Sequence, residues 1–192
     1  MLGDLKSIPF QLDAGIFLED ERLLIPWLTP RESLKKLGIP ELHATIDYLS
    51  LSWRDRLVLG GLRCTFHTRQ RAVGKPANGL LQAESLIFVD FDRLPAPFGG
   101  LASIDEEYQD TQRHLSTHLG TPSRSWRGEW SSLHSEWIFP SFFVHLCTDD
   151  REGCALAIFH ETASKLMPDK ALIAAYAFDM FGSANKTPKM IL

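Results

Sequence analysis

The stretch SIDEEYQDTQRHLSTHLGTP, residues 103–122, contains the start, the body and the end of one helix. Ser103 is a typical N-cap, and Glu106 three residues later completes a capping box. Gly120 stops the helix, and Pro122 follows just beyond it. Between these signals, apolar side chains and one threonine recur every three or four residues, at Ile104, Tyr108, Thr111, Leu115 and Leu119. The pattern predicts a helix over residues 102–119 with one face toward a core.

A shorter stretch, TPRESLKKLGIP at residues 29–40, follows the same plan. Thr29 is the expected N-cap, Pro30 takes the first helical position and Gly38 ends the helix. An apolar strand precedes each helix, and a tryptophan followed by strand-like runs comes after each. We therefore expect an α+β fold of two similar β-β-α-β lobes, residues 1–75 and 80–182, within a single domain of residues 1–192. The lobes should form a largely antiparallel sheet with helices packed on one face.

Further strands are expected where apolar, aromatic and β-branched residues gather between turn residues. In the first half these runs are 10–18, 23–27, 42–51 (where a helix is the alternative), 56–59 and 62–68. In the second half they are 80–91, 126–133, 136–148 with a break at Pro140, and 154–160. Residues 70–79 lack apolar periodicity and predict a loop, and 165–181 predict a final helix.

Composition limits the function classes. The 192 residues are 44% hydrophobic and 23% charged, which is enough to bury a core. A net charge of −4 argues against general nucleic-acid binding. The N-terminus does not resemble a signal peptide, and no apolar run approaches the about 18 residues that span a bilayer. Three cysteines without tight spacing predict reduced thiols and a cytoplasmic location.

Charge is distributed unevenly along the chain. Residues 53–75 contain six basic residues and one acidic residue, whereas residues 81–120 contain seven acidic and two basic residues. Such segregation can steer a charged partner. The alternative is that both runs are solvated faces that offset each other in the fold.

No residue pattern matches a known catalytic or metal motif: CxxC, HExxH, GxSxG, GxGxxG and the phosphate-binding loop are all absent. His145 and Cys147 are two apart on a predicted strand and should share one face, as should Asp90 and Asp92. These residues could form a small hydrolase or transferase site; the alternative is that the cysteines are core residues. We therefore expect no catalytic residues, no metal and no cofactor.

Aromatic residues are concentrated in one part of the second predicted lobe. Trp126, Trp130 and Trp137 fall within twelve residues, and alternation along a strand means that they cannot all face one core. Either some of them are exposed anchors for a partner or the sheet is covered on both faces.

The second half of the chain resembles small bacterial immunity proteins. The shared order is FDRLP at 91–95, an acid-capped helix, LGTPS at 119–123, and then Trp130 with paired strands. Such proteins are cytoplasmic antidotes to the toxins of contact-dependent and secretion-system competition. The apolar strand at 23–27 and its following helix are compatible with this resemblance.

The resemblance implies a non-enzymatic protein that binds a cognate toxin and occludes it, with no nucleic acid or membrane as partner. An acidic helix face could meet a basic, nuclease-like cleft. The expected contact residues are Asp105, Glu106, Asp110, Trp126, Trp130 and Trp137. The alternatives are the hydrolase or transferase described above and an adaptor that uses its aromatic sheet to form a homodimer.

Overall fold

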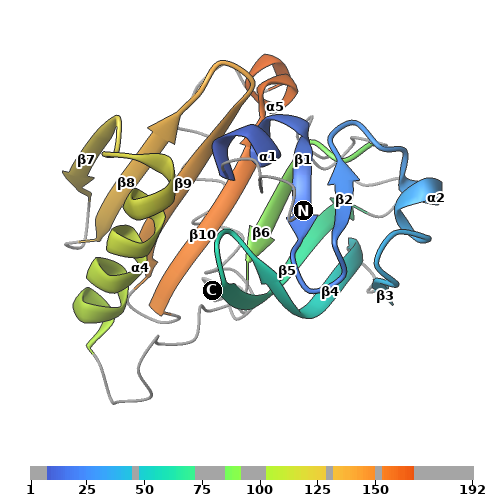
Figure 1. The fold of residues 1–192 in the computed structure, drawn as a ribbon, viewed down its shortest axis with the longest axis horizontal. Coiled ribbons are helices and arrows are strands. Elements are labelled where there is room, and N and C mark those ends of the chain that lie inside the picture. The colour runs from blue at the N-terminus through green and yellow to red at the C-terminus, as the bar shows by residue number, and fades with distance from the viewer. Residues whose placement is uncertain are drawn as a thin grey trace, which may run out of the picture.

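The computed structural model describes residues 8–44, 48–71, 85–91, 103–128, 132–149 and 153–166. They form a mixed α+β fold with mostly antiparallel strands and few helices (Figure 1). The described helices are α1 (Ile8–Ala14), α2 (Arg31–Leu34), α4 (Ile104–Leu119) and α5 (Glu161–Leu166). The described strands are β1 (Gly15–Leu18), β2 (Leu23–Pro26), β3 (Glu41–Ala44), β4 (Tyr48–Val58), β5 (Leu62–Arg71), β6 (Phe88–Phe91), β7 (Arg124–Arg127), β8 (Leu133–Ile138), β9 (Phe142–Asp149) and β10 (Gly153–His160).

Eight strands form one sheet in the order β3-β4-β5-β6-β10-β9-β8-β7. The strands from β3 to β6 are neighbours in chain order, and so are those from β7 to β10. The two runs meet where β6 pairs with β10, with Asp90 opposite Ala157. The helix α4 lies in the chain between β6 and β7 and so separates the two runs. Strands β1 and β2 form a separate hairpin.

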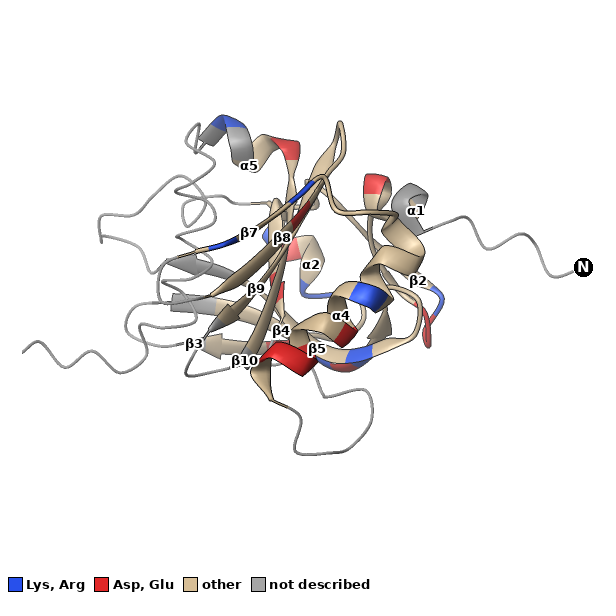
Figure 2. Ribbon diagram, turned by 90° about the vertical axis from the view of Figure 1, so that its left-hand side faces the viewer, with Lys and Arg blue, Asp and Glu red and all other residues tan. Residues whose placement is uncertain are grey.

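One face of this sheet carries the main core. Helices α4 and α1 lie on the same side of strands β8 to β10, as Figure 2 shows. A single apolar cluster joins Leu12 of α1, Ile25 of the hairpin, Trp53 of β4, Leu115 of α4 and Ile158 of β10. This cluster therefore spans both predicted lobes, and the division into two similar lobes stays a prediction.

The helix α4 forms as its sequence predicts. Ser103 Oγ accepts a hydrogen bond from the Glu106 backbone N–H, and the Glu106 carboxylate accepts one from the Ser103 backbone N–H at 2.8 Å. The stripe residues Tyr108, Thr111 and Leu115 are buried. After the last turn, the chain leaves the helix at Gly120, whose φ of 83° is easily adopted without a side chain.

The N-terminal prediction needs two corrections. The hairpin exists, but residues 10–14 belong to α1 rather than to its first strand. The strand begins at Gly15, where a Cβ would collide with the Ile25 carbonyl oxygen, so this position needs glycine. The second helix is also shorter than predicted and ends at Leu34. Its N-cap is Pro30, because the Thr29 hydroxyl donates instead to the Pro26 carbonyl oxygen at 2.7 Å.

Other boundaries also differ. The predicted strand 42–51 is two strands, β3 and β4, and the predicted strand 126–133 is divided between β7 and β8. The break near Pro140 is confirmed, and a turn at Gly60-Gly61 joins β4 to β5. The described part of the predicted strand 80–91 is a short β6, and α5 begins four residues before the predicted final helix. Most of the predicted loop 70–79 and residues 167–181 of that helix lie outside the described residues.

The expected packing of helices on one face also needs correction. Ala163 of α5 lies with Phe88 and Phe159 in a second apolar cluster, on the sheet face opposite α4. Helices therefore contact both faces. In the described residues, no helix is both long and apolar enough to cross a bilayer. All three cysteines are buried and none forms a disulfide.

Candidate functional site

The sheet face opposite α4 carries polar residues aligned across several strands. Directly paired positions run from β7 to β5, so their side chains share one face. In that order they are Arg124, Glu136, His145, Ala157, Asp90 and His67. The neighbouring row lies two residues away on each strand, later in the chain on β7 and β9 and earlier on β8 and β10, and consists of Trp126, His134, Cys147 and Ala155. Strand pairing thus places His134, His145 and Cys147 side by side.

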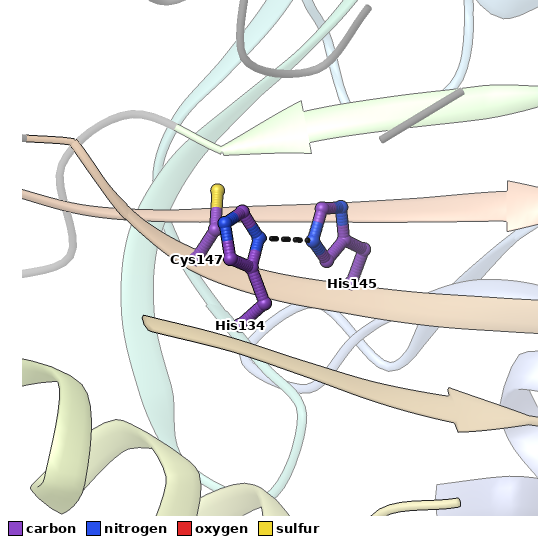
Figure 3. A group of neighbouring side chains, drawn as sticks. All are labelled: His134, His145 and Cys147. Atoms are coloured by element: carbon purple, nitrogen blue, oxygen red, sulfur yellow. Dashed lines mark hydrogen bonds between the residues drawn. The ribbon is translucent and has the colours of Figure 1, made fainter. Parts of the chain in front are cut away.

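These three residues form a compact buried cluster (Figure 3). The Nδ1 atom of His134 lies 3.1 Å from the Nε2 atom of His145, within hydrogen-bond distance. One possible ligand atom from each of His134, His145 and Cys147 can be chosen so that all three lie within 4.8 Å of one another. His145 and Cys147 are almost fully buried, at 1% and 2% exposure.

Trp126 stacks on the cluster from the edge strand β7. Its ring lies 4.8 Å from the His134 ring, centroid to centroid, and nearly parallel to it, and 5.9 Å from the His145 ring. The Arg124 guanidinium lies 5.0 Å from the Trp126 ring centroid, and its Nε donates to Glu136 at 2.6 Å. The stacked rings restrict access to the histidines from this direction.

The backbone beside the cluster leaves room for the His134 ring. A Cβ at Gly128 would lie 2.7 Å from His134 Nε2, so only glycine allows this approach without a shift. His134 Nε2 also lies 2.8 Å from the Ser132 hydroxyl. Contacts from both sides therefore fix the orientation of this imidazole.

Burial keeps the two histidines neutral. Burial is the largest cause that lowers the pKa of His145 to about 3, and the nearby His134 and Arg124 contribute to the same shift. Burial also lowers the pKa of His134, although Glu136 opposes this shift. A neutral imidazole has one nitrogen lone pair that can accept a proton or bind a metal ion. The cluster therefore offers two such nitrogens and a thiol at neutral pH.

The expected contact residues on α4 lie away from this cluster. Asp105 and Glu106 are exposed in the first turn, and hydrogen bonds from Ser103 lower the pKa of Glu106. Asp110 is half-buried and pairs with Arg113 at 2.7 Å. The first turn of α4 thus provides exposed negative charge.

The expected tryptophans do not form one surface. Trp137 is buried in the core beneath α4, where its Nε1 donates to the Gly120 carbonyl oxygen at 2.8 Å, so its assignment to an exposed contact face is wrong. Trp126 is 36% exposed on the opposite sheet face, and Trp130 lies outside the described residues. The acidic turn of α4 and Trp126 therefore cannot contact one flat surface together.

The residues of the hydrolase alternative are brought together only in part. His145 and Cys147 share a face, as predicted. Asp90 is buried in the same polar row, but Ala157 stands between it and His145, and Asp92 lies outside the described residues. Sequence reasoning missed His134, which lies opposite Cys147 on the neighbouring strand β8. A predicted strand that began at residue 133 would have placed His134 and Glu136 on the same face of the sheet.

A second histidine pair was also overlooked. His114 and His118 are four residues apart on α4, and their ring centroids are 5.0 Å apart. His114 Nε2 lies 2.9 Å from the Leu59 carbonyl oxygen, so this pair joins α4 to the end of β4.

Comparisons of the chain with models of protein families, with curated proteins and with solved structures found no match.

Proposed function

We propose that this is a non-enzymatic binding protein of the bacterial immunity type, which neutralises a cognate toxin by binding and occluding it. The single observation that carries the proposal is the exposed, rigidly held acidic first turn of α4. The proposed partner surface is a basic cleft such as a nuclease presents. The proposed place of action is the cytoplasm.

The acidic turn suits recognition because it is already ordered. The reciprocal Ser103–Glu106 hydrogen bonds fix the start of the helix. Further along, the Tyr108 hydroxyl lies 2.7 Å from the Ser135 hydroxyl, which ties α4 to the sheet. Because these side chains are ordered before binding, less conformational entropy is lost when a partner docks.

The charges support a role in steering. Asp105 and Glu106 are exposed in the first turn of α4, drawn red in Figure 2, whereas Glu107 in the same turn is buried. Exposed charges of one sign raise the association rate with a partner of opposite sign, and salt screens this effect. We infer that the partner binds over the N-terminal end of α4, with Trp126 outside the contact.

The first experiment tests the function itself. The protein is co-expressed with each protein encoded beside it, and growth and complex formation are measured. We expect one neighbour to be toxic alone, harmless when co-expressed, and recovered with this protein in a stoichiometric complex. If no neighbouring product is toxic, or if none is both neutralised and bound, the proposal fails.

The second experiment tests the surface. The double variant Asp105→Asn, Glu106→Gln removes two charges while glutamine retains the capping hydrogen bonds. We expect the association rate with the toxin to fall roughly tenfold at low salt, and less at high salt. The matched control Asp20→Asn, Asp55→Asn removes two charges from exposed positions outside α4, one in the turn between β1 and β2 and one in β4, and should leave the rate unchanged. Equal rates for both double variants would place the contact elsewhere.

We also propose that the fold consists of two similar β-β-α-β lobes. This pattern is supported by the positions of α2 and α4, each of which precedes a run of antiparallel strands.

The alternative to a toxin as partner is a second copy of this chain, with which it would form a homodimer. A monomeric mass by light scattering at high protein concentration would contradict that alternative.

A further inference from the structure

We propose that His134, His145 and Cys147 bind a zinc ion on the sheet face opposite α4. This site is separate from the acidic turn and goes beyond the proposed function, because it requires no toxin. It departs from the expectation that the chain has no metal ligands. The donor atoms, their spacing and the residues that surround them support the site.

The donor set suits zinc. Zinc in proteins is bound by imidazole nitrogen and thiolate sulfur, usually with four ligands in tetrahedral geometry. The cluster supplies two imidazoles and a thiol, all buried. Hard ions such as Mg²⁺ and Ca²⁺ prefer oxygen ligands, which are absent from this group of three side chains.

The spacing is close to that of two ligands on one zinc ion. Zn–N bonds of about 2.0–2.1 Å at a tetrahedral angle separate the two nitrogens by about 3.3 Å. His134 Nδ1 and His145 Nε2 are 3.1 Å apart. With a Zn–S bond of about 2.3 Å, the sulfur needs to be about 3.6 Å from each nitrogen. One ligand atom from each side chain can be chosen so that all three lie within 4.8 Å of one another, so a side-chain shift of about an ångström would complete the set.

The surroundings supply what a metal site needs. When His134 binds through Nδ1, its Nε2–H can donate to the Ser132 hydroxyl 2.8 Å away, an outer contact that orients a metal-bound imidazole. Glu136 is buried in the same polar row, beside His145, and its negative charge favours a cation, whereas Arg124 opposes it. The Trp126 ring restricts the approach of solvent. Three protein ligands leave a fourth position for water or another donor.

Binding has a defined proton balance. Each neutral histidine keeps one N–H and presents its other nitrogen to the metal, so the histidines release no proton. The Cys147 thiol must lose its proton to become a thiolate ligand. Binding of one Zn²⁺ therefore forms one Zn–S and two Zn–N bonds and releases one proton to solvent.

The experiment begins with full-length protein stripped of metal by a chelator. Titration with Co²⁺ should produce the near-ultraviolet absorption of a cobalt–thiolate bond, saturating at one ion per chain, and Zn²⁺ should abolish it. Zinc should also raise the melting temperature by several degrees, because it binds the folded state preferentially. Absence of both the absorption band and the thermal shift at micromolar metal would overturn the proposal.

Variants identify the ligands. Cys147→Ser should eliminate the cobalt–thiolate band, and His134→Gln should weaken binding by roughly tenfold or more. The matched control is Cys154→Ser on the neighbouring strand β10, because Cys154 is equally buried but belongs to the α4-side core. It should retain the band. A band that persists in Cys147→Ser and disappears in Cys154→Ser would refute the assignment.

A measurement on the unaltered chain covers the case in which a variant fails to fold. Alkylation of native protein is followed by mass spectrometry of its cysteine-containing peptides, with and without zinc. Zinc should slow modification of Cys147 much more than modification of Cys64 and Cys154, which are protected only by the general stabilisation of the fold. Equal slowing at all three cysteines would show general stabilisation rather than ligation and would contradict the site.

Discussion

The two faces of the strands β8, β9 and β10 are both buried, yet they differ in chemistry where β8 and β9 pair. On the α4 side, Val144, Leu146, Leu156 and Ile158 are fully buried and apolar. On the opposite side, residues one position away on β8 and β9 are histidines, a cysteine and a glutamate, also buried. Because side chains alternate along a strand, the same short segments form an apolar core and a polar cluster. Burial alone therefore does not reveal which face carries function.

The two faces also stabilise the fold in different ways. Apolar burial on the α4 side stabilises the fold in proportion to the area removed from water. Buried imidazoles gain little unless each polar atom finds a partner, and the close pairings of His134 with His145 and with Ser132 supply such partners. The zinc proposal assigns a ligand to this polar cluster.

The largest expected effect compares two tryptophans on opposite faces. Trp137→Ala should lower the free energy of unfolding by about 3–5 kcal/mol, because it leaves a large cavity in the core. Trp126→Ala should cost only about 1 kcal/mol, the scale of a ring-stacking contact at a partly exposed position. Denaturant unfolding with unchanged m-values measures both. Equal losses would mean that the two faces contribute alike to stability.

The next effect concerns acid stability of the metal-free protein. His145 has a pKa of about 3 in the fold and about 6.5 when unfolded, so protons bind preferentially to the unfolded chain between these values. The contribution of His145 to the free energy of unfolding should therefore be largest above pH 6.5 and fall by about 1.4 kcal/mol per pH unit below it. His134 acts in the same direction, while Arg124 and Glu136 are the charges nearest the pair.

The His145→Gln variant isolates this contribution. Its unfolding free energy should depend less steeply on pH between 6.5 and 4.5 than that of the unaltered protein, when both are measured without metal. His43→Gln, at an exposed position on β3, is the matched control and should keep the original slope. Identical slopes in all three proteins would show that His145 does not remain neutral in the fold.

Local signals in the sequence were sufficient for some elements and insufficient for others. The helix α4 was predictable because its cap, apolar stripe and terminating glycine lie within twenty consecutive residues. The helix α1 was mistaken for a strand because Leu12 and Ile16 suit either periodicity over such a short run. Only the contact of Gly15 with the distant Ile25 backbone shows where the strand begins.

The candidate site was predictable only in part for a similar reason. The shared face of His145 and Cys147 follows from their spacing within one strand. Their contact with His134 depends on the register between β8 and β9, which is fixed by the turn near Pro140 and by the packing of Trp137 on the other face. No spacing within a single strand contains that information, so the cluster becomes visible only in the folded sheet.

The smallest effect tests the helix that covers the apolar face. Ser103→Ala removes the capping hydrogen bond and should lower the free energy of unfolding by about 1 kcal/mol. Ser116→Ala within the same helix is the control, and it should cause no loss because alanine has the higher helix propensity. The cobalt absorption of the opposite face should be unchanged in both variants, since α4 does not contact His134, His145 or Cys147 through its cap. A weakened cobalt site in Ser103→Ala alone would show that the two faces are coupled through the sheet.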